Sequence, residues 1–276
     1  MSSATLPRDG ETLSRVAGPP AHKLIVSWQD PSSRAMIPIG VLEFDGDVYS
    51  FAYLQKASEL TGFQPLLGFP ELQKRYESAE LFALFAQRAM DSSRPDFDRY
   101  ISELGLTDDA STPWEQISRS GGSSEGDTIQ LFPVPRYQGG EWRCHFLAAG
   151  VRHLLKKSVP IAGEHVGPYK AEELEDLLSS LSPGDQLSLI SEPTNDWTSL
   201  ALIVATDSSR PVGYVPTMLL DAISEPHQNG LIDVCVSKVN SLEAGWHLRL
   251  IVELTAHLEP EFEFFKGDDW ALATSS

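Results

Sequence analysis

Cysteine is scarce in this sequence. The chain of 276 residues has two, Cys144 and Cys235. Two isolated cysteines make neither a four-ligand zinc site nor the disulfide framework of a small secreted protein. We expect both to be buried thiols that behave as small apolar side chains.

Long hydrophobic runs are absent as well. No stretch of 18 apolar residues occurs, and the N-terminus lacks the charged-then-apolar pattern of a signal peptide. These absences predict a cytoplasmic protein without a membrane partner.

The sequence lacks the motifs of the common catalytic sites. The glycine-rich segment at residues 120–126 has no Lys-Ser/Thr after it and precedes no helix, so it predicts a linker, not a phosphate loop. No Gly-x-Ser-x-Gly elbow or His-Glu-x-x-His pattern occurs, and the seven histidines are scattered. We expect no metal, no cofactor and no enzymatic activity.

Basic residues are few. The chain has 21 Lys and Arg against 39 Asp and Glu, a formal charge of −18. Proteins that follow a phosphate backbone usually carry a basic excess, because counterion release drives their affinity. The overall charge therefore repels nucleic acid at long range, although a local basic pocket can exist within an acidic surface.

The remaining composition predicts a folded α+β protein of more than one part. A hydrophobic content of 41% is enough for a buried core. We expect a flexible tail over residues 1–20, an α+β domain over 21–138, a β-rich domain over 139–258 and an acidic, aromatic tail over 259–276.

Local patterns predict the main elements. Asp45-Gly46-Asp47 predicts a hairpin turn between two strands, and Thr112-Pro-Trp-Glu115 a capped helix start. A helix is expected near residues 78–90, another from Ser93 to Gly105, an amphipathic one over 170–181 and one that begins at Thr217. Strands are expected over residues 23–28, 37–44, 48–53, 142–151, 231–239 and 247–258.

Several motifs after Trp142 resemble the HIRAN domain. They are Phe146-Leu-Ala-Ala-Gly-Val-Arg-His153, Pro183-Gly-Asp185, Glu192-Pro-Thr-Asn195 and Gly213-Tyr-Val-Pro216. The resemblance covers about 110 residues. It implies a small β-barrel with one or two helices, a module that in some helicases binds the 3′ end of single-stranded DNA.

The preceding part resembles the N-terminal segment of bacterial proteins that end in a HIRAN domain. The residues concerned are Ser27-Trp-Gln-Asp-Pro31, Ile39-Gly-Val-Leu42, Tyr76-Glu-Ser-Ala-Glu-Leu-Phe82 and Arg119-Ser-Gly-Gly122. That segment is similar to the small N-terminal subdomain of HipA-type toxin kinases, without their ATP-binding or catalytic motifs. The resemblance implies a bacterial source.

The HIRAN resemblance also implies the binding residues. Arg152 and His153 match an Arg-aromatic pair that forms one wall of the DNA-end pocket, and Asn195 and Trp197 match the opposite loop. An aromatic ring can stack on any base, and Arg or Asn can donate to phosphate or base edges. Tyr214 is the fifth candidate, as a core residue or a stacking surface.

The sequence departs from that pattern at three places. Asp196 replaces a proline, Thr198 replaces the acid that would accept from a terminal hydroxyl, and Pro216-Thr217 offers no basic residue. Trp197 can alternatively cover the end of the barrel, and Asn195 can satisfy its own loop backbone.

Two functional hypotheses follow. The first is a non-catalytic accessory protein that binds single-stranded or 3′-end DNA in DNA processing or defence. The alternative is an acidic protein–protein interaction module of a toxin–antitoxin or phage-defence assembly, with a partner encoded nearby and no DNA binding. Its candidate contact segments are residues 62–70 and 259–265, although most of their aromatic rings are expected to lie in the core.

Overall fold

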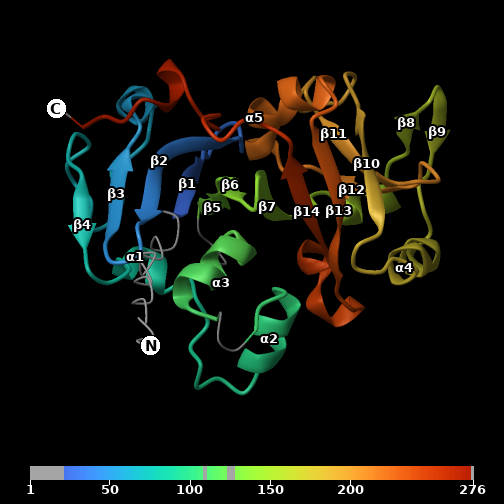
Figure 1. Ribbon diagram of the computed structural model, residues 1–276, viewed down its shortest axis with the longest axis horizontal. Coiled ribbons are helices and arrows are strands. Elements are labelled where there is room, and N and C mark those ends of the chain that lie inside the picture. The colour runs from blue at the N-terminus through green and yellow to red at the C-terminus, as the bar shows by residue number, and fades with distance from the viewer. Residues whose placement is uncertain (1–21, 108–110, 123–127, 275–276) are drawn as a thin grey trace, which may run out of the picture.

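The protein was analysed as a computed structural model that describes residues 22–107, 111–122 and 128–274. The expected tail at residues 1–20 lies outside them, as does most of the glycine-rich segment at 120–126. Within the described chain, two antiparallel sheets lie side by side, with helix α3 between them (Figure 1). The fold is therefore mixed α and β, with few helices.

Five strands form the N-terminal sheet in the order β4-β3-β2-β1-β5. Their bounds are β1 His22–Gln29, β2 Met36–Phe44, β3 Tyr49–Tyr53, β4 Tyr76–Ser78 and β5 Ile129–Pro133. The predicted hairpin at residues 45–47 is confirmed. The Asp45 carboxylate accepts hydrogen bonds from the backbone N–H groups of Asp47 (2.9 Å) and Val48 (2.8 Å), and Gly46 has φ 111°.

An aromatic cluster fills the core beneath this sheet. The Phe51 ring lies 4.6 Å from Phe69 and 5.7 Å from Phe85, between ring centroids. The Tyr53 hydroxyl donates to the Phe69 carbonyl at 2.9 Å and accepts from the Leu66 N–H at 2.7 Å. Burial raises the pKa of that phenol to about 12. The aromatic rings of the segment at residues 62–70, Phe63 and Phe69, are thus buried and are not exposed anchors for a partner.

The short helices of this half are α1 Ala83–Ala86, α2 Phe97–Glu103 and α3 Pro113–Ser120, with a 3₁₀ turn η1 at Gln55–Glu59. The helix expected near residues 78–90 is much shorter than predicted, since its first residues form β4 and it begins only after Phe82. The capped start of α3 is confirmed. The Thr112 hydroxyl accepts from the Glu115 N–H at 3.3 Å, a cap that stabilises a helix by about 1 kcal/mol.

The C-terminal sheet has seven strands in the order β12-β11-β10-β13-β14-β7-β6. Their bounds are β6 Arg136–Gln138, β7 Glu141–Leu147, β10 Gln186–Ser191, β11 Leu202–Thr206, β12 Pro211–Tyr214, β13 Ile232–Val239 and β14 Leu250–Ala256. A small hairpin, β8 Val159–Ile161 with β9 Glu164–Val166, is separate from it. The helices of this half are α4 Ala171–Ser179 and α5 Thr217–Gln228, as expected. The 3₁₀ turns are η3 Val151–Leu155, η4 Leu242–Ala244, η5 Trp246–Leu248 and η6 Asp268–Trp270.

The expected small barrel is not a closed one. An isolated bridge joins Tyr214, the last residue of the edge strand β12, to Ala149, just beyond β7, the strand next to the other edge. The strand expected over residues 142–151 ends at Leu147, because Gly150 takes a left-handed conformation (φ 65°) and starts η3. The sheet is thus an open one that curls until β12 touches the segment after β7.

The last segment of the chain connects the two halves. Phe264 packs on Trp142 of the C-terminal sheet, with ring centroids 5.3 Å apart. The chain then returns to the N-terminal sheet, where the Gln55 N–H donates to the Ala271 carbonyl and the Ala273 N–H to the Tyr53 carbonyl, each at 2.8 Å. Figure 1 shows this path as the red segment that crosses the top of the molecule. Its buried Phe264 is therefore a structural residue.

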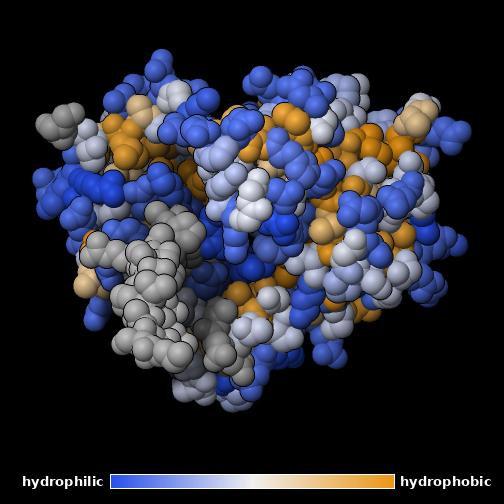
Figure 2. Space-filling view, in the orientation of Figure 1, coloured by the Kyte–Doolittle hydropathy of each residue, from blue (hydrophilic) through white to orange (hydrophobic). Residues whose placement is uncertain are grey.

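The face seen in Figure 2 is largely hydrophilic, with apolar side chains visible between polar ones. Among the described residues, no helix has the length and apolar character needed to cross a membrane.

A buried arginine holds α4 against the sheet. Arg249, only 1% exposed, donates to both carboxylate oxygens of Glu175 at 2.6 and 2.9 Å, and to the Asn240 carbonyl at 2.9 Å. Asn240 in turn donates to the Glu103 carbonyl of α2 at 2.7 Å. One guanidinium thus links α4 to the β13–β14 connection, which contacts the N-terminal half.

Substitution of Glu175 tests this link. Glu175→Gln leaves the buried guanidinium without a counter-charge, so we expect the free energy of unfolding to fall by about 2 kcal/mol. The control is Glu172→Gln, an exposed position on the same helix, which should change it by less than about 0.5 kcal/mol. Urea unfolding measures both, and equal effects would mean that the pair does not stabilise the docked helix.

Candidate functional site

Four of the five residues singled out in the sequence line one pocket of about 220 Å³: His153, Asn195, Trp197 and Tyr214. His153 comes from η3, Asn195 and Trp197 from the β10–β11 loop, and Tyr214 from the end of β12. Lys157, Thr198 and Thr217 complete the polar part of its lining. We call this the Trp197 pocket.

Arg152 faces elsewhere. It lines a larger neighbouring cavity between the two sheets, and only Ala149 and Gly150 line both. The Arg-aromatic pair that the resemblance places on one wall is therefore divided between two cavities in this chain.

The two aromatic rings of the pocket differ in exposure. The indole of Trp197 is 83% exposed, an unusual state for a large apolar side chain. Tyr214 is half-buried, and its phenol lies near the Glu192 carboxylate. Burial, followed by the charges of Glu192 and Asp196, raises the pKa of the phenol well above its usual value. Tyr214 is therefore a fixed neutral wall, whereas Trp197 is free to contact a ligand.

Asn195 holds the loop in place. Its side-chain amide donates to Glu192 at 2.5 Å, and its side-chain oxygen accepts from the Trp197 N–H at 3.0 Å. Glu192 itself is 2% exposed. Both polar atoms of the Asn195 side chain thus serve the loop, as in other Asx turns, and they position Trp197.

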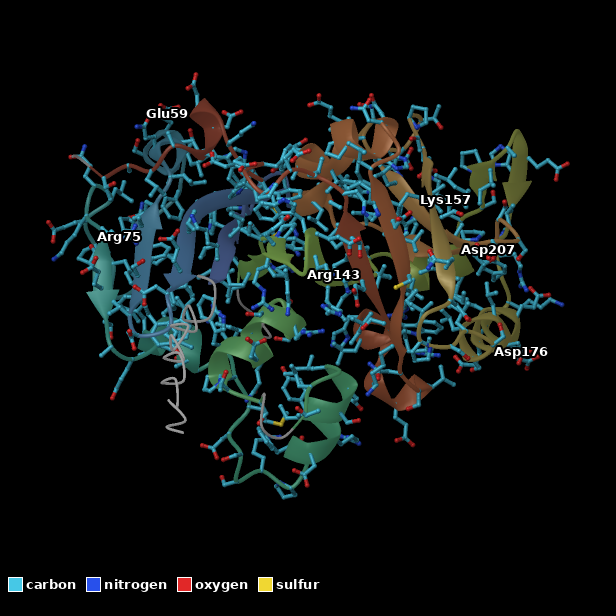
Figure 3. All side chains as sticks on the ribbon, in the orientation of Figure 1. Glu59, Arg75, Arg143, Lys157, Asp176 and Asp207 are labelled. Carbon is cyan, nitrogen blue, oxygen red and sulfur yellow. The ribbon has the colours of Figure 1, made fainter. Side chains whose placement is uncertain are left out.

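Lys157 is the functional candidate that sequence reasoning missed. Its ammonium group lies 2.6 Å from the Asp196 carboxylate, so an ion pair links the segment after η3 to the β10–β11 loop, with Lys157 but not Asp196 in the pocket lining. Lys157 lies in the C-terminal half of the molecule in Figure 3. The available signal was the run Arg152-His-Leu-Leu-Lys-Lys157, a concentration of cations in an acidic half of the chain.

The ion pair shifts the pKa of both Lys157 and Asp196. The hydrogen bond and the charge of Lys157 lower the pKa of Asp196, and the hydrogen bond to Asp196 raises that of Lys157. Both groups are charged at neutral pH, so Asp196 competes with any anion for Lys157.

Helix α5 begins at the pocket. Thr217 is its first residue, and Pro216 at the N-cap provides no side-chain hydrogen bond to the first turn. The free N–H groups and the positive end of the helix dipole favour an anion there. The positive end of the helix dipole lies where this chain has Thr217 and no basic residue.

Neither cysteine lies in the Trp197 pocket. Burial raises the pKa of Cys144 to about 12 and also raises that of Cys235. Within the described ranges, no group of three or more His, Cys, Asp or Glu side chains is placed to hold a metal ion.

Comparison with known proteins gives a limited result. No family model matches the chain, and no curated protein matches it. Among solved structures it is similar to the HIRAN domain of human HLTF, with 17% identity and a TM-score of 0.27 over 44% of this chain and 81% of that one. It is also similar to a protein from Lactobacillus plantarum, with 17% identity and a TM-score of 0.29 over 43% of this chain and 100% of that one. Both TM-scores are too low to assign the fold.

The left-handed turn at Gly150 can be tested by substitution. A Cβ atom there would lie 3.1 Å from Cδ2 of Tyr214, in a backbone conformation that costs an L-residue about 1–2 kcal/mol. Gly139 is a matched control, because it has the same φ of 65° and nothing within 4 Å of its Cβ position. Both alanine variants should lose stability, and Gly150→Ala should lose about 1 kcal/mol more. Equal losses in denaturant unfolding would show that Gly150 is not needed for the approach of Tyr214.

Proposed function

We propose that the protein is a non-catalytic module that binds the end of a single-stranded DNA in the Trp197 pocket. One observation carries the proposal: the exposed indole of Trp197 lies in the same pocket as Lys157 and the N-terminus of α5, which has no side-chain cap. A strand end offers an unstacked base to the indole and phosphates to the two positive groups. The sequence motifs that resemble the HIRAN domain support the same ligand.

The charges around the pocket favour a ligand that contacts the protein through few nucleotides. The protein carries 18 more acidic than basic side chains, so distant phosphates are repelled. Among the described residues that line the pocket, Lys157 is the cation, the start of α5 adds a partial positive charge, and His153 adds an imidazole. A ligand that places one or two nucleotides there gains the stacking contact with little repulsion elsewhere.

The main test is fluorescence anisotropy with a labelled ten-nucleotide oligothymidylate that ends in a 3′-hydroxyl, at low salt. Trp197→Ala should weaken binding at least tenfold, because a stacked base contributes about 1–3 kcal/mol. The control Leu242→Ala removes another exposed apolar side chain, on η4, and should have no effect. Because few phosphates are contacted, the slope of log K against log salt should be only about −1.

Two outcomes would contradict the proposal. One is no binding at tens of micromolar protein, and the other is binding that is unchanged in Trp197→Ala. A circular oligothymidylate that binds as well as the linear one would remove the preference for an end.

Removal of Asp196 tests the competition for Lys157. Asp196→Asn abolishes the ion pair at 2.6 Å and one repulsive charge, so the oligonucleotide should bind about fivefold more tightly. Asp176→Asn, an acid on α4 that does not line the pocket, is the control and should leave affinity unchanged. The same titration measures both, and an unaltered affinity for Asp196→Asn would place the phosphates away from Lys157.

A further inference from the structure

A larger cavity of about 460 Å³ lies between the two sheets. Helix α3 and strand β5 form one wall, and β7, η3 and η5 form the other. These elements occupy the centre of Figure 1. We call it the inter-sheet cavity. Its polar side chains include Arg119 and Gln130 on the first wall and His145, Arg152, Trp246 and His247 on the second.

No carboxylate lines this cavity among the described residues. The chain has 39 acidic and 21 basic side chains, so a lining with two arginines and no acid opposes the overall composition. Carboxylates of Glu115 and Glu253 line a smaller adjoining cavity, where Arg143 is paired with Glu253 at 3.0 Å. Figure 3 shows Arg143 near the centre of the molecule, between α3 and β14.

The two arginines of the inter-sheet cavity lack the partners that other arginines have. Within the described chain, neither Arg119 nor Arg152 forms an ion pair or a side-chain hydrogen bond, whereas Arg143 and Arg249 each bind carboxylates. Arg119 is half-buried at the end of α3, and burial lowers its pKa. The Arg119 guanidinium is partly desolvated, and the charges of Glu115 and Glu253 act on it without an ion pair to either. An anion in the cavity would offset its remaining desolvation cost, whereas Arg152 is exposed.

His145 reports the local potential. Burial, and then the charges of Arg119, Arg136 and Arg143, lower its pKa to about 4. The Glu253 carboxylate lies 3.3 Å from Nε2, but the arginines and burial outweigh its attraction. The imidazole is thus neutral at neutral pH, chiefly because it is buried and in addition because the three arginines oppose its protonation.

The rest of the lining suits a nucleotide. The volume falls in the range of small-molecule sites. Trp246 provides a flat aromatic surface, held by the Arg249 guanidinium 5.7 Å from its ring centroid. The Gln130 amide can donate to or accept from the edge of a base. Arginine is the residue best suited to grip a phosphate with two parallel hydrogen bonds.

We infer that the inter-sheet cavity binds a nucleotide, with its phosphate on Arg119 and Arg152 and its base toward Trp246. The phosphate belongs either to a free nucleotide or to a strand that continues past Ala149 and Gly150 from the Trp197 pocket. The inference does not depend on the Trp197 pocket, because Arg119 and Trp246 do not line that pocket.

The experiment is isothermal titration of the full-length protein with thymidine monophosphate, adenosine monophosphate and inorganic phosphate. A nucleoside monophosphate should bind at least tenfold more tightly than inorganic phosphate. Arg119→Gln should weaken nucleotide binding at least tenfold, and Arg119→Lys less, because lysine keeps the charge but loses the two-pronged contact. Arg99→Gln, an arginine on the surface of α2 that lies 3.8 Å from Glu103, is the control and should bind as the unaltered protein does.

Arg152→Gln, on the opposite wall, provides a second variant should Arg119→Gln fail to fold, and it should also weaken nucleotide binding. The inference is overturned by no nucleotide binding at 1 mM, by inorganic phosphate that binds as tightly, or by affinity unchanged in the folded variants.

Competition with the oligonucleotide identifies the source of the phosphate. If the oligonucleotide displaces the nucleoside monophosphate, and Arg119→Gln also weakens oligonucleotide binding, the phosphate belongs to the strand. If the oligonucleotide does not displace the nucleoside monophosphate, the cavity binds a free nucleotide. Trp197→Ala tests the other pocket separately and should leave nucleoside monophosphate binding intact.

Discussion

Two backbone hydrogen bonds between Ala149 and Tyr214 determine where both cavities lie. The Ala149 N–H donates to the Tyr214 carbonyl and the Tyr214 N–H to the Ala149 carbonyl, each at 2.8 Å. They join the edge strand β12 to the segment after β7 and bring η3 beside the start of α5. Gly213 permits this approach, since a Cβ there would lie 3.0 Å from Cβ of Ala148. Without the bridge, the residues after β7 would have no fixed relation to the β10–β11 loop.

Charge is distributed in this protein by pairing. The buried Arg249 is neutralised by Glu175, and the exposed Arg143 by Glu141 and Glu253. Because acidic side chains outnumber basic ones, we expect most basic side chains to form ion pairs of this kind. A basic side chain that lines a cavity and has one carboxylate partner, or no ion pair, is therefore an exception. Lys157 forms an ion pair with one acid, whereas Arg119 forms none in the described chain, although the charges of Glu115 and Glu253 act on it. This contrast, more than net charge, identifies surfaces where an anion can bind.

Local patterns in the sequence predict much of the fold. The Asp45-Gly46 turn, the Thr112 cap and the helix that begins at Thr217 are confirmed, because each depends on residues close in sequence. The prediction of a long helix near residues 78–90 was wrong, because the helix has a single turn, Ala83–Ala86. Phe82 and Phe85 on either side of its start both pack against Phe69. Closure of the sheet was also overestimated, because it depends on one long-range contact that no local pattern specifies.

The candidate site was predictable only in part, for a similar reason. The motif places Trp197 and Asn195 on one loop, and the structure brings that loop to His153 and Tyr214. The ion pair of Lys157 with Asp196 joins residues 39 positions apart and depends on how η3 ends. No local spacing rule could have found it, although the cluster of cations after Arg152 marked the segment.

The geometry of η3 explains why Arg152 and His153 cannot act together on one ligand group. A 3₁₀ helix has three residues per turn, so neighbouring side chains project about 120° apart. Val151 and Leu154, on the third side, are buried at 2% and 1% exposure and fix the rotation of the helix. Arg152 is thereby directed to the inter-sheet cavity and His153 to the Trp197 pocket. A strand that contacts both must pass Ala149 and Gly150, the two residues that line both cavities. The turn at Gly150, which packs against the Tyr214 ring, is therefore also the point at which the two cavities can share one ligand.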